Sequence, residues 1–376
     1  MKNKKILIFR QQLFKPSETF ITAQAENLVD YTPIYVGRKE YGEAPKNSET
    51  VLLADPSLLN QIKYVCSRSP KKEVVSKFKD NIELIHAHFA IDGVYAMKLA
   101  KELDVPLIVT LHGFDVTRSL SDMLWNFKPS FYNYAIHRKE LFRKVDKFIC
   151  VSDFIRQKAI NAGFPENKLV THYIGIDIDE FKYRENQPEE KIILHVARLV
   201  EKKGTTYLLK ALAEIKNHIA EVKLVIIGDG PLRSKLEDEA KSLDLEENVE
   251  FLGVQPNTVV KKWLDKASLM CVPCIVADYG VAEGLGIVNL EAAAKGVPVV
   301  AFASGGIVEA VVDGVTGYLV PEKNIKLLSK RMVEILSNKE LQVKLGKQSR
   351  DYVVLKHNQR KQNIKLEDLY KEIVNL

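Results

Sequence analysis

Residues 282–302 read Ala-Glu-Gly-Leu-Gly-Ile-Val-Asn-Leu-Glu-Ala-Ala-Ala-Lys-Gly-Val-Pro-Val-Val-Ala-Phe, a helix-forming run followed at once by a strand-forming one. Two glycines precede the run and Gly296 closes it, so we expect a helix from about 286 to 296. A strand is expected over 297–302, and an apolar run at 269–273 precedes the helix. A strand, a helix and a second strand in this order are typical of a parallel α/β sheet.

The same alternation continues in both directions along the chain. A length of 376 residues suits two domains. The polar segment 184–190 has one proline and no apolar residue, as expected of a linker. We therefore expect an N-terminal domain over 1–186 and a C-terminal domain over 187–354. A final amphipathic helix over 355–376 has no strand of its own to cover. Further strands are expected at 5–10, 32–36, 83–87, 107–111, 147–151, 191–196, 222–227 and 249–252.

Composition excludes several classes of protein. Hydrophobic residues make up 46% of the chain and charged residues 28%, which excludes collagen-like, coiled-coil and wholly disordered proteins. Four cysteines are too few for a disulfide scaffold. No apolar stretch is long enough for a membrane span or a signal peptide, so we expect a cytoplasmic protein. The net charge of +6 is modest, and no nucleic-acid partner is expected.

The start of the expected helix at 286–296 is a candidate binding site. Its first N–H groups lack partners within the helix and carry the positive end of the dipole, which favours a phosphate group. Glu291, one turn in, leans back toward this end, and Glu283 lies just outside it. Two carboxylates beside a bound anion suit sugar hydroxyls, so the pattern indicates a nucleotide-sugar site. An ordinary amphipathic helix with two solvated glutamates is the alternative.

A basic loop follows the expected strand at 191–196. It reads Ala-Arg-Leu-Val-Glu-Lys-Lys-Gly over 197–204. In parallel α/β sheets, ligands bind beyond the carboxyl ends of strands. The guanidinium of Arg198 and the ammonium of Lys203 would together suit a diphosphate. A solvated basic loop is the alternative.

These motifs, with others in the same order, resemble family 4 of the retaining glycosyltransferases, which have the GT-B fold. The segment at 16–21 resembles the subgroup that builds bacterial exopolysaccharides. The motifs are Glu283 with Glu291, the 197–204 loop, Gly-Asp-Gly-Pro-Leu at 228–232, His-Ala-His-Phe at 86–89, Thr-Leu-His-Gly-Phe-Asp at 110–115, and Pro-Ser-Glu-Thr-Phe-Ile at 16–21. The resemblance implies two doubly wound Rossmann-like domains facing each other across a cleft, with the C-terminal helix crossing back to the first domain.

The resemblance also assigns roles in the second domain. Arg198 and Lys203 would hold the diphosphate, Glu291 the ribose hydroxyls and Glu283 the hydroxyls of the donor sugar. The remaining donor-side positions are Gly230, Val254, Gly286, Ile287 and Val288. Ala197 stands where the family often has glycine, and Ile287 where it often has a small residue or proline. Neither departure removes a charged group.

In the first domain, the resemblance places His112 at the donor sugar as a catalytic residue, beside Gly113 and Asp115, which would shape the turn. The expected acceptor-side residues are Ser17, Glu18, Thr19, His88 and Asp115. Residues 17–19 equally suit the start of a helix, where serine, threonine and acidic side chains are common.

The implied reaction moves a hexosyl group from a nucleoside diphosphate sugar, UDP favoured over GDP, to a saccharide or lipid-linked saccharide. It would need no cofactor and no metal, and would retain the anomeric configuration. A non-hydrolysing nucleotide-sugar epimerase and a catalytically silent glycan-binding subunit remain as alternatives. A dehydrogenase would need the third glycine of the dinucleotide fingerprint, which is Arg233 here.

The aromatic segment 123–134 is followed by His-Arg-Lys at 137–139 and Arg-Lys at 143–144, and together they mix aromatic and basic residues. This mixture suits a helix packed by its aromatic face, which we favour. The alternative is a peripheral contact with an anionic membrane surface.

Overall fold

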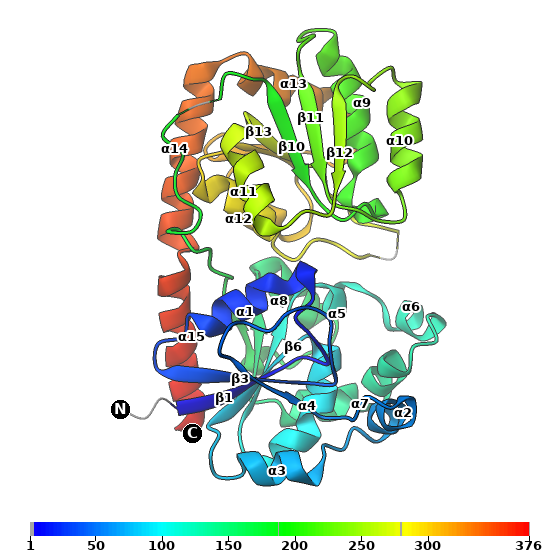
Figure 1. Ribbon diagram of the computed structural model, residues 1–376, viewed down its shortest axis with the longest axis vertical. Coiled ribbons are helices and arrows are strands. Elements are labelled where there is room, and N and C mark those ends of the chain that lie inside the picture. The colour runs from blue at the N-terminus through cyan, green and yellow to red at the C-terminus, as the bar shows by residue number, and fades with distance from the viewer. Residues whose placement is uncertain (1–3, 187, 279, 376) are drawn as a thin grey trace. The chain divides into compact units, whose positions relative to one another are not determined.

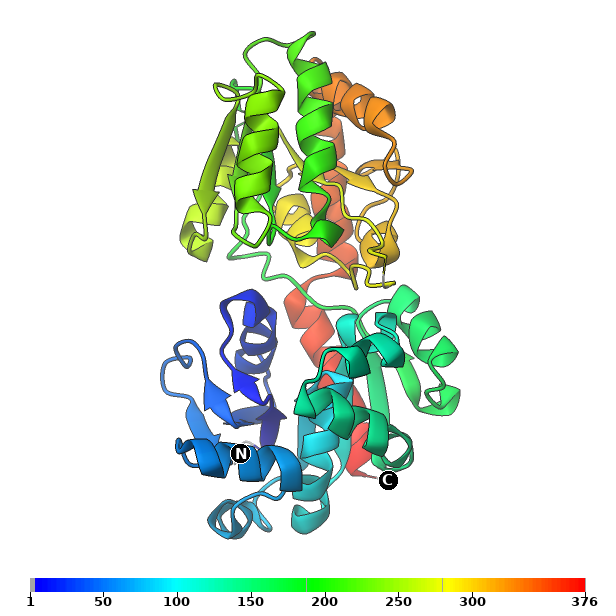
Figure 2. The ribbon, with the colours of Figure 1, turned by 90° about the vertical axis from the view of Figure 1, so that its right-hand side faces the viewer.

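The chain folds into two compact units. The computed structural model describes residues 4–186, 188–278 and 280–375. Unit 1 comprises residues 1–175 and 359–376, and unit 2 comprises residues 176–358. In each unit, helices cover both faces of a parallel sheet (Figures 1 and 2).

Unit 1 contains a seven-stranded sheet in the order β5-β3-β1-β6-β7-β8-β9, with every strand pair parallel. The strands are β1 Lys4–Phe9, β3 Tyr31–Gly37, β5 Glu49–Leu52, β6 Leu84–His88, β7 Leu107–Leu111, β8 Lys147–Cys150 and β9 Leu169–Thr171. Every residue of β6 and β7 is buried, as expected of central strands covered on both faces. The strand order reverses between β1 and β6, and ligands bind at such a point in doubly wound sheets.

The helices of unit 1 follow the strands in alternation. They are η1 Pro16–Glu18, α1 Thr19–Glu26, α2 Leu58–Ser67, α3 Lys72–Phe78, α4 Ala90–Leu103, α5 Phe114–Thr117, α6 Leu120–Trp125, α7 Pro129–Lys144, α8 Asp153–Asn161, η2 Glu166–Lys168 and α15 Gln359–Val374. Two short strands, β2 Gln12–Leu13 and β4 Lys39–Glu40, pair separately.

The last helix of the chain, α15, is part of unit 1 (Figure 1). Tyr370 is fully buried in the core that β1 and β6 share. The Glu367 carboxylate accepts hydrogen bonds from the N–H groups of Val29 and Asp30 at 2.7 and 2.8 Å. The resemblance correctly implied that the C-terminal helix returns to the first domain.

Unit 2 contains a six-stranded parallel sheet in the order β12-β11-β10-β13-β14-β15. The strands are β10 Ile192–Val196, β11 Lys223–Ile227, β12 Val249–Gly253, β13 Leu269–Val272, β14 Val299–Phe302 and β15 Gly317–Val320. The helices are η3 Glu201–Lys203, α9 Thr205–Lys216, α10 Arg233–Ser242, α11 Asn257–Lys266, α12 Ile287–Ala294, η4 Gly305–Glu309, α13 Ile325–Leu336 and α14 Lys339–Lys356. The opening stretch is therefore the β13-α12-β14 unit.

The unit boundaries differ from the expected ones at 186/187 and 354/355. The chain divides instead after residues 175 and 358. Within unit 2, Phe181 and Arg184 are 4% and 5% exposed, and Arg350 of α14 donates to the carbonyl of Phe181 at 2.8 Å. The Arg184 guanidinium donates to the carbonyl of Ala267. Arg184, the first residue of the expected linker at 184–190, is therefore packed within unit 2, and the linker prediction is wrong at this end.

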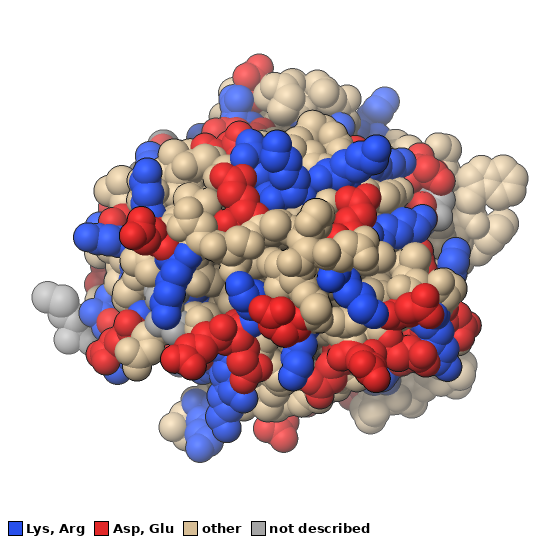
Figure 3. Space-filling model, turned by 90° about the horizontal axis from the view of Figure 1, so that it is seen from above, with Lys and Arg blue, Asp and Glu red and all other residues tan. Residues whose placement is uncertain are grey.

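Charged side chains of both signs are interspersed on the face drawn in Figure 3. The described residues of that face form no large single-sign patch of the kind that a polyanion requires. None of the described helices combines the length and the low polarity that crossing a bilayer demands.

Candidate functional site

The N-terminus of α12 is shaped by Gly286. This residue has φ +76°, a left-handed conformation that favours glycine, and a Cβ there would collide with the side-chain amide of Asn289. The N–H of Asn289 already bonds to the carbonyl of Gly286 at 2.9 Å. The N–H groups of Ile287 and Val288 have no hydrogen-bond partner within the described part of the chain. They form the anion-attracting end of the helix that the sequence predicted.

Glu283 lies at the centre of a small ionic cluster before α12. Its Oε2 is 2.7 Å from Nζ of Lys203 and 3.3 Å from Nζ of Lys202. The side chains of Lys203 and Glu283 are 15% and 19% exposed. Although burial opposes ionisation of both groups, Glu283 raises the pKa of Lys203 to about 12, and the two lysines lower the pKa of Glu283 to about 2. Lys203 and Glu283 are therefore both charged at neutral pH.

The loop that carries both lysines packs against the loop after β13. Gly204 has φ +65°, and any side chain there would collide with the carbonyl oxygen of Pro273. The N–H of Ile275 donates to the carbonyl of Lys202 at 2.9 Å. These backbone contacts hold the loop of Lys203 against the loop that leads to Glu283, a residue 80 positions later in the sequence.

Arg198 is exposed and forms no ion pair among the described residues. The N–H of the next residue, Leu199, donates to the carbonyl of Asp229 at 2.9 Å, and Gly230 packs against the carbonyl of Leu199. The loops after β10 and β11 thus lie side by side. Gly230 therefore has a packing reason to be glycine, independent of any ligand. Val254, just beyond β12, is 72% exposed.

Glu291 has a different environment from Glu283. Burial and the nearby Glu180 raise its pKa to about 7, against the opposing charge of Lys261. Lys261 itself pairs with Glu180 at 2.7 Å. Across the described residues, the Glu291 carboxyl makes no hydrogen bond and no ion pair. The two carboxyl groups of the motif thus differ in pKa, which suits different roles.

Two polar side chains near this helix were missed by sequence reasoning. Asn289 is fully buried, and neither its amide nitrogen nor its amide oxygen has a hydrogen-bond partner in the region described. Lys202 shares Glu283 with Lys203. Lys202 was recognisable as the neighbour of Lys203 in the basic loop, whereas an asparagine inside an apolar helix gave no signal of its burial.

In unit 1, His112 follows β7 and His88 ends β6. Nδ1 of His88 lies 3.0 Å from Nε2 of His112. Burial, with Arg10 and His86 nearby, holds the pKa of His112 well below its usual value, so the ring is neutral at pH 7. His88 is only 1% exposed, so its side chain contacts His112 rather than the surface.

Asp115 stabilises the turn after β7. It is 2% exposed and accepts hydrogen bonds from the N–H groups of Ala90 and Gly113 at 2.9 and 3.0 Å. Burial raises its pKa to about 6, although these N–H groups oppose the rise. The structure therefore gives Asp115 the turn-shaping role and leaves its carboxylate no exposed surface for an acceptor.

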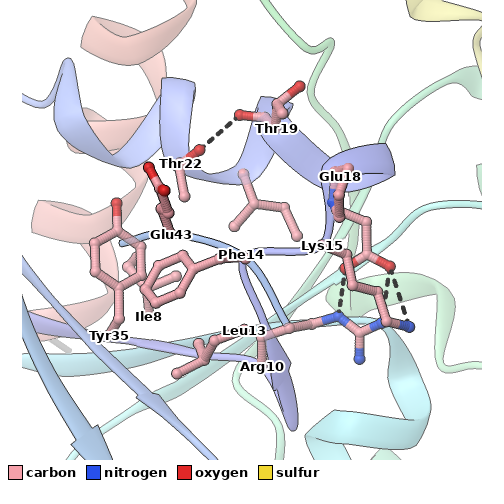
Figure 4. Close-up of a pocket in the computed structure, with 13 residues that line it drawn as sticks. Ile8, Arg10, Leu13, Phe14, Lys15, Glu18, Thr19, Thr22, Tyr35 and Glu43 are labelled. Carbon is pink, nitrogen blue, oxygen red and sulfur yellow. Dashed lines mark hydrogen bonds and ion pairs between the residues drawn. The ribbon is translucent and has the colours of Figure 1, made fainter. Parts of the chain in front are cut away.

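The segment 16–19 lines a cavity of about 320 Å³ in unit 1 (Figure 4). Glu18 forms a two-point ion pair with Arg10, at 2.8 and 3.0 Å, and makes no side-chain cap to α1. Ser17 is exposed and does not line the cavity. The lining residues are Ile8, Leu13, Phe14, Pro16, Ile21 and Tyr35 among the apolar and aromatic ones, with Arg10, Lys15, Glu18, Thr19, Thr22, Gly42 and Glu43.

Comparison with known proteins identifies the family. Residues 177–352 match the model of glycosyl transferases group 1, and residues 39–180 match the model of glycosyltransferase family 4. The chain belongs to glycosyltransferase family 4. A relative, the putative colanic acid biosynthesis glycosyltransferase WcaL of Salmonella typhimurium, is 32% identical over 66% of this chain and 60% of its own length. An uncharacterized glycosyltransferase of Methanocaldococcus jannaschii is 30% identical over 73% of this chain and 71% of its own.

The family 4 fold also agrees with solved structures. Anabaena HepE in complex with UDP and glucose superposes with a TM-score of 0.77 at 20% identity, covering 98% of this chain and 100% of that one. At this identity the likeness establishes the fold alone, and that fold is GT-B. The implied architecture of two Rossmann-like units is therefore confirmed. The chain spans about 60% of the length of WcaL.

Proposed function

We propose that this chain is a retaining hexosyltransferase. It transfers a hexosyl group from a nucleoside diphosphate sugar, UDP-sugar favoured, to a hydroxyl of a saccharide or lipid-linked saccharide. The observation that carries the proposal is the pair of lysines held by Glu283, which lies in the loop that leads into α12 and its unpaired N–H groups. Likeness to WcaL and to the UDP-bound HepE structure supports a role in glycan synthesis and a uridine donor.

Each charged residue would have a distinct task at the donor. Lys203 and the exposed Arg198 would hold the diphosphate together with the N–H groups of α12. Lys203 has three N–H donors and can bind a phosphate oxygen while it keeps Glu283. Glu283, ionised at every pH of interest, would accept hydrogen bonds from sugar hydroxyls, and Glu291 would accept them from the ribose.

The chemical barrier is the charge that develops as the sugar separates from the diphosphate. Each preorganised donor in such a site contributes about 3 kcal/mol to stabilising the departing group. We propose attack on the same face of the sugar. The acceptor oxygen bonds to the anomeric carbon as the carbon–phosphate oxygen bond breaks, and that phosphate oxygen takes the acceptor proton. Protein cations and N–H groups would stabilise the leaving group, and the proposed reaction uses no metal and no cofactor.

Turnover with a panel of UDP- and GDP-sugars tests this function. We expect a glycosylated acceptor whose new bond keeps the anomeric configuration of the donor, read by NMR. Isomerisation of the donor without any acceptor would instead identify an epimerase. Nucleotide binding with no turnover on any donor and acceptor would identify a silent binding subunit. Either result would contradict the transferase.

The cavity in unit 1 is the candidate acceptor site. It combines an aromatic wall, Phe14 with Tyr35 at 5.2 Å between ring centroids, with polar lining residues that include Glu43 and Thr19. Apolar faces beside hydroxyl-binding groups suit a sugar ring. His88 and Asp115 do not line it, so we retain only Glu18 and Thr19 of the expected acceptor residues as cavity residues.

We expect Thr19→Val to raise the acceptor KM about fivefold, since one hydrogen bond is lost. The donor KM should stay unchanged. Ser17→Ala is the matched control, because Ser17 lies beside Thr19 and outside the cavity. Steady-state kinetics with the acceptor found in the panel give both constants. Equal acceptor KM values for Thr19→Val and the wild type would contradict the assignment of this cavity as the acceptor site.

A second partner surface lies on α6 and α7. The segment 123–134 has features of both a packed helix and a membrane contact. Met123, Phe131 and Tyr134 are buried, as in a packed helix. Trp125 and Phe127 are 76% and 73% exposed, as expected of a membrane contact. Lys128, just before α7, and Lys139, in the second half of α7, are both exposed. Exposed aromatic rings beside lysines suit an anionic bilayer, which would bring the enzyme to a lipid-linked acceptor.

We expect the wild type to sediment with vesicles that contain anionic phosphatidylglycerol, and to be released by salt. The double variant Trp125→Ser/Phe127→Ser should lose at least about 80% of this binding, because two interfacial rings are removed. Ile364→Ser, which removes an exposed apolar residue on α15, is the control and should bind as the wild type does. Equal binding by the double variant and the control would exclude this surface.

A further inference from the structure

Three imidazole rings form one stack at the ends of β6 and β7. The ring centroids of His86 and His88 lie 4.5 Å apart at an interplanar angle of 27°, and those of His88 and His112 lie 5.2 Å apart at 24°. Nδ1 of His88 and Nε2 of His112 are 3.0 Å apart. The other nitrogen of His112, Nδ1, has no hydrogen-bond partner in the described part of the chain.

His86 anchors this stack from inside the core. Its Nδ1 lies 2.6 Å from the hydroxyl of Tyr370, and its Nε2 lies 2.6 Å from the hydroxyl of Thr110. Because both nitrogens are bonded, the ring cannot rotate without losing a hydrogen bond. His88 therefore packs on a fixed surface, and the C-terminal helix supplies one of its two anchors.

His112 is held on its other sides by aromatic rings. Its centroid lies 4.6 Å from that of Phe89 and 5.0 Å from that of Phe20. The Arg10 guanidinium lies 4.5 Å over Phe89. Burial, with His86, His112 and Arg10 around it, keeps the pKa of His88 well below its usual value. Both histidines are thus neutral, and a single proton lies between them.

The shared proton links the two tautomers. If Nδ1 of His88 donates, His112 carries its own proton on Nδ1. If Nε2 of His112 donates, its Nδ1 is an acceptor. We propose that His88 is a positioning residue: its hydrogen bond to Nε2 fixes one orientation and one tautomer of His112, and so decides what the free Nδ1 offers to the sugar. Only the last step rests on the proposed function.

Two substitutions separate hydrogen bonding from packing. His88→Asn places an amide close to the position of Nδ1 and keeps the hydrogen bond. His88→Phe keeps a stacked ring but loses the hydrogen bond. We expect His88→Phe to lower kcat about tenfold with the donor KM nearly unchanged, and His88→Asn to restore most of the rate. Thermal unfolding of each variant shows whether the fold is kept.

A spectroscopic measurement tests the tautomer without any turnover. In protein labelled with ¹⁵N-histidine, the His112 ring nitrogens are assigned by comparison with His112→Gln. The wild type and His88→Asn should show the two well-separated shifts of a single neutral tautomer, and His88→Phe should show shifts drawn together by exchange. Separated shifts in His88→Phe would overturn the proposal. Averaged shifts with an unchanged kcat would support the positioning role of His88 and contradict the role of His112 in transfer.

Discussion

Lys203→Ala should lower kcat/KM for the nucleoside diphosphate sugar by about 100-fold or more. Two effects act together. The variant loses a donor to the leaving diphosphate, and it leaves the Glu283 carboxylate with Lys202 alone, at 3.3 Å. An under-compensated carboxylate in a partly buried site then repels the incoming anion. Steady-state kinetics with the preferred donor measure the loss.

Lys210→Ala is the matched control for Lys203→Ala. Lys210 lies on the following helix, its side chain is 47% exposed, and its contact with Glu239 is long, at 3.8 Å. Its removal should leave kcat/KM within about twofold, as for other exposed ion pairs. If Lys203→Ala proves too unstable to assay, Glu283→Gln tests the same cluster. This variant removes the charge but keeps the shape, and should still lose more than about tenfold. Wild-type kinetics in both variants would rule out this site.

Glu291→Gln should stabilise the protein while it weakens donor binding. The pKa of Glu291 is raised to about 7 from an ordinary value of 4.5, mainly by burial and then by Glu180. The folded state therefore holds this proton more tightly than the unfolded chain does. The free energy of unfolding falls as pH rises from about 4.5 through about 7, at a total cost of roughly 1–3 kcal/mol. Glutamine removes this cost.

The measurement is thermal unfolding at two pH values. Glu291→Gln should raise Tm at pH 8 and change it little at pH 4, and its UDP affinity at pH 8 should fall about tenfold because one charged acceptor for the ribose is lost. Between pH 6 and pH 8, UDP affinity should rise more in the wild type than in the variant, where only the ionisation of the UDP phosphate remains. Glu246→Gln, at an exposed glutamate of the same unit, is the control. A Tm at pH 8 that is unchanged or lower in Glu291→Gln would contradict this account.

The strand-helix alternation was readable because most strands of this fold are buried on both faces. Strands β7 and β14 consist mainly of apolar residues, and β6 adds two buried histidines. All three strands were predicted within one or two residues. Strand β5 was not predicted, since all four of its residues are only partly buried and its sequence has no strong pattern.

The unit boundary could not be read from composition. The polar segment from Arg184 looked like a linker, but Arg184 is buried by contacts with distant residues. The actual crossing lies after Gly175, between the apolar residues Ile174 and Ile176. Gly175 packs directly against Gln359, so the chain leaves and re-enters unit 1 at one place. A contact between segments so far apart in the chain produces no local sequence pattern from which the boundary could be predicted.

The candidate site residues were found from spacing and resemblance, but not their partners. Nothing in the sequence pairs Lys203 with Glu283, or His88 with His112. The first pair depends on how the loops after β10 and β13 pack, and the second on the register of β6 beside β7. For this reason His88 was expected at the acceptor, and only the structure shows its side chain against His112.

The central claim is that the start of α12 and the Lys203 loop bind a diphosphate. A crystal structure of the protein with UDP tests it most directly. We expect the diphosphate oxygens within hydrogen-bond distance of the N–H groups of Ile287 and Val288 and of Nζ of Lys203, with the ribose hydroxyls on Glu291. UDP bound at any other place in unit 2, with Lys203 still held only by Glu283, would contradict the account.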